Sequence, residues 1–242
     1  MEAIRTTNLV KKYKEKTAVN NLNLTVHSGE LYALLGVNGA GKSTTIKILS
    51  CLTQPTSGEA CVMGRSVTKE SDKVKAIMNV SPQETAVAAK LSVRENLELI
   101  ARIYGSDKKD ARRKADEMLD RLSMREIERS RAATLSGGWQ RRLSIAMALI
   151  TEPEILFLDE PTLGLDVLAR RELWRLIEKL KGKMTIILTT HYLEEAESLS
   201  DRIGIMSRGV LLAEGTAAEL KERAGTDDFE EAFIRITEEA AK

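Results

Sequence analysis

The chain has 242 residues, 43% of them hydrophobic and 30% charged, a composition typical of a soluble globular protein with one large α/β domain or two small domains. Its 37 Lys and Arg residues balance 36 Asp and Glu residues, which argues against binding nucleic acid or an acidic membrane through bulk charge. No apolar run approaches the roughly 20 residues that span a bilayer, and no secretion signal is expected at the N-terminus.

The first 30 residues are predicted to form an antiparallel sheet at the edge of the domain. Short apolar runs, "AIRTTNLV" and "AVNNLNLTV", alternate with turn residues and lead into a turn over 27–29. The continuous apolar run "LYALLG" (31–36) predicts a strand buried on both faces, and a helix is expected to follow from about Lys42 to before Pro55. The segments "EACVMG" (59–64) and "AIMNVS" (76–81) are two further predicted strands.

Between about Leu91 and Leu149 the pattern becomes helical. Ser92 and Glu95 form a predicted capping box for the helix "SVRENLELIARIY". A second helix is predicted in "KKDARRKADEMLDRLSM" (108–124), and its charges are interpreted as a solvated face.

Strands and helices alternate again after Pro153. The predicted strands are "EILFLD", "MTIILTT" and "RIGIMS", and Leu173, Ile177 and Leu180 line one face of the helix between the first two. This order predicts a parallel sheet covered by helices and interrupted by a helical insert, all within one domain.

The segment "GVNGAGKS" (Gly36–Ser43) has the spacing of a phosphate-binding loop, between a predicted strand and a predicted helix. Its glycines let backbone N–H groups approach phosphate oxygens, and the helix N-terminus favours negative charge. Lys42 can reach the β- and γ-phosphates, and the Ser43 hydroxyl can bind Mg²⁺. A glycine-rich turn without function is the disfavoured alternative.

The segment "ILFLDEP" (Ile155–Pro161) ends an apolar strand in two carboxylates. Asp159, at the tip of the strand, can hold Mg²⁺ directly or through water. Glu160 points in a different direction and can accept a proton from an attacking water. An acidic pair at a strand end is often only a turn, but its combination with a phosphate loop favours catalysis.

The segment "LSGGWQRR" (135–142) looks like an anion-binding helix start, although it has neither a preceding strand nor a following Lys. Gln83 follows a strand and precedes the helical insert, and His191 ends a strand and is expected near the phosphates. Tyr13 is an isolated aromatic residue in a charged loop, where it could pack or stack on a base.

In this order and spacing, the phosphate loop, Gln83, "LSGGW", "ILFLDEP", "GLD" (Gly164–Asp166) and His191 resemble the nucleotide-binding subunit of an ABC transporter over essentially the whole chain. The resemblance implies an ATPase that uses ATP and Mg²⁺. It implies an α/β fold with a P-loop NTPase core of mostly parallel strands, an N-terminal antiparallel β subdomain and an inserted helical subdomain. In the single domain 1–242, the core and β subdomain would occupy approximately 1–83 and 153–242, and the helical subdomain 84–152.

The resemblance also implies roles for individual residues. Tyr13 would stack on adenine, Gln83 would sense Mg²⁺ and the membrane partner, and Asp166 would belong to a loop that contacts the partner protomer. Lys42, Gln83, Glu160 and His191 would be catalytic, with His191 holding the γ-phosphate and the attacking water. Ser43, Gln83 and Asp159 would serve the metal. The residues expected to cradle ATP are Tyr13, Gly36, Val37, Asn38, Gly39, Ala40, Gly41, Lys42, Ser43 and Thr44, together with Ser136, Gly137 and Gly138.

In this family two nucleotide-binding domains dimerise head to tail, which would explain "LSGGW". Its Ser136–Gly138 helix start would close over the ATP held by the other chain's phosphate loop. The partner would be a second copy or a similar subunit, with ATP at the interface. Trp139 stands where the family usually has Gln, and it would either pack in the core or lie beside the dimer seam.

The segment "TTHYLEEAESLSDRIGIMSRGVLLAEGT" and the acidic tail "DDFEEAFIRIT" resemble the prokaryotic branch that exports drugs, polysaccharides and similar cargo. The subunit would lie on the cytoplasmic side of the cell membrane, held there by an integral membrane permease, without a nucleic-acid partner. A soluble ABC ATPase that acts on ribosomes or DNA is the alternative, and a small-molecule kinase is weaker because it leaves "LSGGW" and His191 unused.

Overall fold

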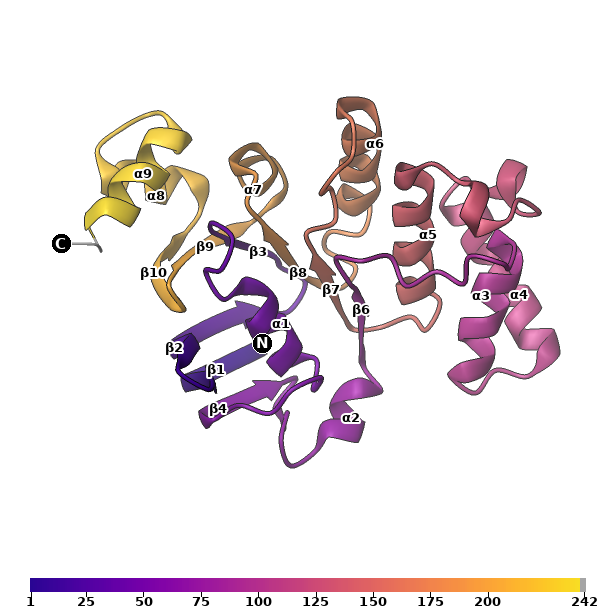
Figure 1. Cartoon of the computed structure of the whole chain (residues 1–242), viewed down its shortest axis with the longest axis horizontal. Helices are drawn as coiled ribbons and strands as arrows, with labels where there is room; N and C mark the ends of the chain where they lie inside the picture. Colours follow the sequence, from indigo (N-terminus) through magenta and orange to yellow (C-terminus); the bar gives the residue numbers. More distant parts are fainter. Residues whose placement is uncertain (240–242) are drawn as a thin grey trace.

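In a computed structural model the described residues are 1–239, and their largest sheet has six strands (Figure 1). The order across it is β10-β9-β3-β8-β7-β6, and every neighbouring pair is parallel except β9 with β10. These strands are β3 (Leu31–Leu35), β6 (Met78–Ser81), β7 (Ile155–Asp159), β8 (Thr185–Thr190), β9 (Arg202–Ser207) and β10 (Val210–Gly215). Strands β3, β7 and β8 are buried along their whole length, as their continuous apolar runs predict.

A second, antiparallel sheet is built from the N-terminal part of the chain, as predicted. Its order is β2-β1-β4-β5, with β1 (Glu2–Tyr13), β2 (Lys16–His27), β4 (Ser57–Val62) and β5 (Arg65–Ser66). Helix α1 (Lys42–Leu49) lies between this sheet and the six-stranded sheet (Figure 1). One apolar core joins all three, because Ile155, Phe157 and Ile187 pack in the same cluster as α1 and strands β1 and β2.

The alternate residues of the same strands face the other way. Leu156, Leu158 and Leu188 pack in a second apolar cluster with helices on the opposite side of the sheet. This cluster includes α6 (Val167–Glu178), whose Leu173 and Ile177 are buried together with the following Leu180, as their helical spacing predicts. The sheet is therefore covered on both faces, and the chain has the predicted α/β fold.

Between β6 and β7 the chain is helical, again as predicted. The helices are α3 (Val93–Ile103), α4 (Lys108–Arg121) and α5 (Gly137–Leu149), with short 3₁₀ turns η1 (Arg125–Ile127) and η2 (Ala132–Thr134) before α5. The capping box is present: Glu95 N–H donates to Ser92 Oγ at 3.2 Å, and Ser92 N–H donates to Glu95 Oε2 at 2.7 Å. Figure 1 shows these helices at one end of the molecule.

The remaining helices are α2 (Ser71–Lys75), α7 (Leu193–Leu199), α8 (Ala217–Ala224) and α9 (Phe229–Glu239). The acidic tail "DDFEEAFIRIT" does not remain a tail, because α9 buries Phe229, Ala232 and Ile236 against an apolar cluster that also includes Leu220 of α8. Strand β10 was also not predicted, although it pairs with β9 over its length. Within residues 1–239, none of the helices combines the length and apolar character required to cross a membrane.

Candidate functional site

The phosphate loop connects β3 to α1, and two of its glycines have no room for a side chain. Gly41 precedes α1 with φ +107°, and a Cβ there would lie 2.4 Å from the Ala18 carbonyl oxygen. A Cβ at Gly36 would lie 2.3 Å from the Met206 carbonyl oxygen. Substitution of either glycine would therefore push the loop away from the strands that support it.

Lys42 is folded back over this loop. Its Nζ donates to the carbonyl oxygen of Gly36 at 2.6 Å and, more weakly, to that of Val37 at 3.3 Å. Only 5% of the Lys42 side chain is exposed, so its charge lies inside the concave side of the loop.

Asp159 lies at the end of β7, beside the first turn of α1. Its Oδ1 accepts hydrogen bonds from Ser43 Oγ at 2.9 Å and from Thr189 Oγ1 at 2.6 Å. Because β7 and β8 are parallel neighbours, their carboxyl ends bring Asp159 and Thr189 to the same edge of the sheet.

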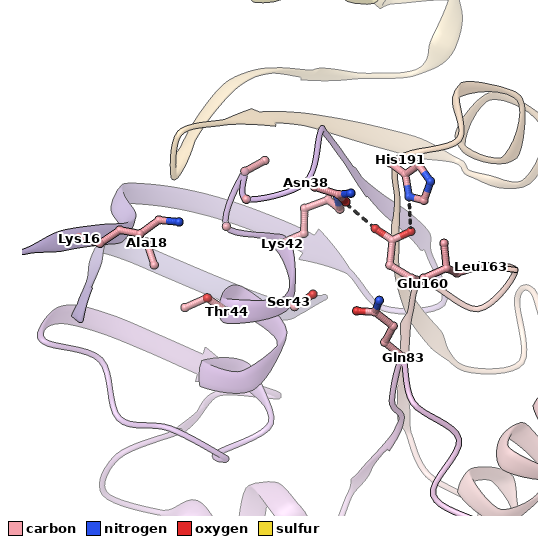
Figure 2. Close-up of a pocket in the computed structure, with 13 residues that line it drawn as sticks. Lys16, Ala18, Asn38, Lys42, Ser43, Thr44, Gln83, Glu160, Leu163 and His191 are labelled. Carbon is pink, nitrogen blue, oxygen red and sulfur yellow. Dashed lines mark hydrogen bonds and ion pairs between the residues drawn. The ribbon is translucent and has the colours of Figure 1, made fainter. Parts of the chain in front are cut away.

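Glu160 bridges two of the predicted site residues (Figure 2). Its Oε1 lies 3.1 Å from Lys42 Nζ, and its Oε2 lies 2.7 Å from His191 Nδ1. The backbone of Glu160, directly after the end of β7, has φ +48°, in the left-handed region. The backbone N–H of Glu160 donates to both the carbonyl oxygen and the hydroxyl oxygen of Thr189.

Arg141 is a residue of this site that sequence reasoning missed. It is 3% exposed on α5, and its guanidinium donates to the carbonyl oxygens of Pro82, Gln83 and Glu160. Burial lowers the pKa of its guanidinium, although the carboxylates of Asp159, Glu195 and Glu160 oppose this effect. Arg141 thus joins the Gln83 segment to the segment that carries Glu160.

A cavity of about 410 Å³ opens over the loop. It brings together Lys42, Ser43, Gln83, Glu160 and His191, and Figure 2 shows the Gln83 amide directed into it. The complete lining is Lys16, Ala18, Asn38, Gly39, Ala40, Gly41, Lys42, Ser43, Thr44, Gln83, Glu160, Leu163 and His191. Of these, Lys16, Ala18 and Leu163 were not predicted, because each reaches the cavity only through the fold.

Several predicted residues lie outside this lining. Gly36, the first residue of the loop, is buried, and Val37 is 57% exposed. Tyr13 is 45% exposed at the end of β1, with the Lys11 ammonium 4.9 Å from its ring centroid. Asp159 lies behind Ser43, to which it is hydrogen-bonded.

Ser136, Gly137 and Gly138 begin α5 away from this cavity. The Ser136 hydroxyl caps the helix by accepting from Trp139 N–H at 3.5 Å. Ser136 and Gly138 line a separate small hollow with Trp139. Trp139 is half-buried against the helical apolar cluster, and the Arg142 guanidinium lies 4.5 Å from its ring centroid.

Comparison with known proteins agrees with this geometry. The family described as ABC transporter matches residues 19–163. The daunorubicin resistance ATP-binding protein DrrA3 of Streptomyces coeruleorubidus is 44% identical over 218 residues, 90% of this chain and 69% of that protein. The linearmycin resistance ATP-binding protein LnrL of Bacillus subtilis is 40% identical over 221 residues, 91% of this chain and 71% of that protein.

Two solved structures extend the likeness to three dimensions. An ATP-binding subunit of an ABC transporter has a TM-score of 0.85 and 28% identity, covering 97% of this chain and 99% of the other. A dimeric ATP-binding cassette in a post-hydrolysis state with ADP and Pi bound has a TM-score of 0.79 and 28% identity, covering 88% of this chain and 98% of the other. The resemblance inferred from the sequence is confirmed: the chain belongs to the ABC transporter family, as an ATP-binding and ATP-hydrolysing subunit.

Proposed function

We propose that the cavity over the phosphate loop binds ATP with Mg²⁺, and that Glu160 removes the proton from the attacking water. The observation that carries this proposal is the position of the Glu160 carboxylate, 3.1 Å from Lys42 Nζ and 2.7 Å from His191 Nδ1. A carboxylate that can act as a base, a lysine that can bind phosphate and a histidine are therefore in contact at one wall of the cavity.

The loop fits the phosphates of ATP. Lys42, Ser43 and Thr44 form the first turn of α1, where backbone N–H groups have no acceptor within the helix and can donate to phosphate oxygens. The strong negative charge of a bound phosphate competes with Glu160 for Lys42. Binding therefore loosens the Lys42–Glu160 ion pair and leaves a Glu160 oxygen available to water.

The donors around Ser43 fit a magnesium ion. The Ser43 hydroxyl and Asp159 Oδ1 are 2.9 Å apart, and the Gln83 amide projects into the same cavity. A hydroxyl, a carboxylate and an amide oxygen are the hard ligands that Mg²⁺ takes beside phosphate and water. When bound, the ion neutralises charge that develops on the phosphate oxygens during transfer. Thr189, which donates to Asp159 at 2.6 Å, fixes the direction of the carboxylate.

His191 has two roles in this arrangement. Through Nδ1 it orients the Glu160 carboxylate, and its other ring nitrogen is free to contact the γ-phosphate or the attacking water. Lys42 and His191 therefore approach Glu160 from opposite sides, which holds the base in one position before the substrate arrives (Figure 2).

The Ser136–Gly138 helix start completes the ATP site of a second subunit. In its own chain it lies outside the cavity, yet its first turn contains two glycines and backbone N–H groups that have no acceptor within the helix, which suits an anion. The structural neighbour that is dimeric and bound to ADP and Pi supports a pair of nucleotide-bound subunits, and the position of Ser136–Gly138 outside its own cavity favours a head-to-tail arrangement. Tyr13, exposed and paired with the cavity-lining Lys16 across β1 and β2, would stack on adenine at the edge of the same site.

The membrane partner is a permease, and the cargo is a drug-like molecule moved by export. The relatives described above are daunorubicin and linearmycin resistance proteins, which supports this cargo class over action on ribosomes or DNA. The subunit would lie at the cytoplasmic side of the membrane through that permease. Residues 84–152 would form the helical subdomain, and approximately 1–83 and 153–242 the core, within one domain.

The experiment compares Glu160→Gln with Glu154→Gln, an exposed carboxylate before β7. General-base contributions are typically about 10²–10⁴-fold, so we expect Glu160→Gln to lose ATP hydrolysis by that factor while it still binds Mg-ATP. The control variant should hydrolyse ATP normally. A wild-type rate in Glu160→Gln would show that Glu160 is not the base.

A further inference from the structure

Glu195 is a carboxyl group that the site described above does not use. It lies in the first turn of α7, four residues after His191, and its relative exposure is 0%. The Trp174 indole Nε1–H of α6 donates to Glu195 Oε1 at 3.0 Å. The neighbouring Glu194 is exposed, as is usual for a charged residue on a short surface helix.

The surroundings of Glu195 are incompletely hydrogen-bonded. Among residues 1–239, neither Glu195 Oε2 nor the Thr162 hydroxyl has a partner of good geometry, although both atoms are buried. The hydroxyls of Thr190 and Thr162 lie near enough to favour the charged carboxylate, but burial outweighs them and raises the pKa of Glu195, with the charge of Glu160 adding to the rise. A buried polar atom without a partner lowers the stability of the fold, so its presence calls for a structural or functional reason.

Glu195 thus lies between three segments, two of which carry residues of the proposed reaction. Thr162 follows Glu160 by two residues, Trp174 belongs to α6, and the first turn of α7 continues directly from His191. We propose that Glu195 is a positioning residue, whose buried carboxyl group holds the first turn of α7, and with it His191, against Trp174 of α6 and the loop that contains Thr162. This inference rests on the role proposed above for His191.

A second contact connects helix α6 to the segment that contains His191. The rings of His191 and Tyr192 have centroids 4.2 Å apart, and the Arg170 guanidinium lies 5.3 Å from the Tyr192 ring. Arg170 and Trp174 are four residues apart and share one face of α6. Helix α6 therefore supports the His191 segment at two points, one above the Tyr192 ring and one at Glu195.

The test measures ATP hydrolysis by Glu195→Ala, Glu195→Gln and the exposed control Glu194→Ala. A misplacement of about 1 Å at a reacting group can cost about 10²-fold, so we expect kcat of Glu195→Ala to fall by up to that factor while KM changes little. The Gln variant should recover most of the rate, because its amide keeps an acceptor for Trp174 and supplies a donor for Thr162. Glu194→Ala should match the wild type.

A double-mutant cycle with His191→Ala distinguishes positioning from general loss of structure. If Glu195 acts through His191, the double variant should be no slower than His191→Ala alone. Trp174→Phe, which removes the indole N–H donor but keeps an aromatic ring in the apolar cluster, provides a second variant if Glu195→Ala does not fold, and its kcat should also fall.

Wild-type kcat in either Glu195→Ala or Trp174→Phe, or additive losses in the cycle, would overturn the inference. A wild-type rate in His191→Ala would instead refute the proposed role of His191, and the inference would fail with it. The two failures are distinguishable, because only the second changes the result for His191→Ala.

Discussion

Replacing Arg141 by Met should destabilise the fold, because three carbonyl oxygens would lose a buried cationic donor. These are the carbonyls of Pro82, Gln83 and Glu160, and the first two lie 59 and 58 residues away in the sequence. Each hydrogen bond to a charged group contributes about 1.5–3 kcal/mol. Desolvation of the cation, which lowers its pKa, offsets several kcal/mol of that gain. We therefore expect the free energy of unfolding to fall by about 2–4 kcal/mol.

The matched control is Arg142→Met, at the next position of the same helix. Arg142 pairs with Glu172 at 2.9 Å, but the Glu172 side chain is 59% exposed. This partly exposed pair and the contact of Arg142 with the Trp139 ring should together contribute about 1 kcal/mol. Urea denaturation of both variants measures the difference in their free energies of unfolding. The comparison requires that fluorescence and circular dichroism give the same transition and that the m-value is unchanged. Equal losses in the two variants would refute the claim that Arg141 joins the Gln83 and Glu160 segments.

Three further predictions test the site. Lys42→Ala should abolish ATP turnover and greatly weaken nucleotide binding in a filter assay, and normal hydrolysis would reject the phosphate-loop assignment. Gly41→Ala should distort the loop and lower both stability and ATP affinity, since its Cβ would lie 2.4 Å from the Ala18 carbonyl oxygen. Gly39→Ala should cost less, because it shares the strain of a positive φ, +83°, but its Cβ would meet no atom of the described residues within 4 Å. Burial raises the pKa of Glu195 in the folded state. The folded protein therefore keeps a proton that the unfolded chain releases above roughly pH 4.3, and the free energy of unfolding should fall as pH rises through that value toward the folded pKa. Glu195→Gln should lack this fall when its unfolding is compared with the wild type across pH, and parallel pH profiles would contradict the prediction.

Local pattern was sufficient for most of the fold. The strands β3, β7 and β8 follow from unbroken apolar runs, and α3 from its capping box. The same holds for the centre of the site, where Lys42 and Asp159 belong to short motifs whose spacing reflects their chemistry. Strand β10 was missed because its alternation is weak, with only Ala213 and Gly215 buried.

The residues that escaped prediction act through contacts made only after folding. Arg141 reaches carbonyl groups in distant segments, and Lys16 reaches the cavity from a neighbouring strand. A signal was nevertheless present: Arg141 recurs with Ile145 and Ala148 at helical spacing, and Glu195 with Leu199, so both charged residues fall on apolar faces. A charge placed on such a face marks a buried partner, but the sequence does not identify that partner.

In the proposed assembly two copies of this subunit share each ATP site, one with its phosphate loop and the other with Ser136–Gly138. The most direct measurement is the sedimentation of Glu160→Gln with and without Mg-ATP, repeated with Ser136→Arg added. We expect a monomer without nucleotide, a dimer with Mg-ATP, and a monomer that still binds ATP when Ser136→Arg is present. A Glu160→Gln protein that stays monomeric with ATP bound, or a dimer that Ser136→Arg does not disturb, would contradict the shared site.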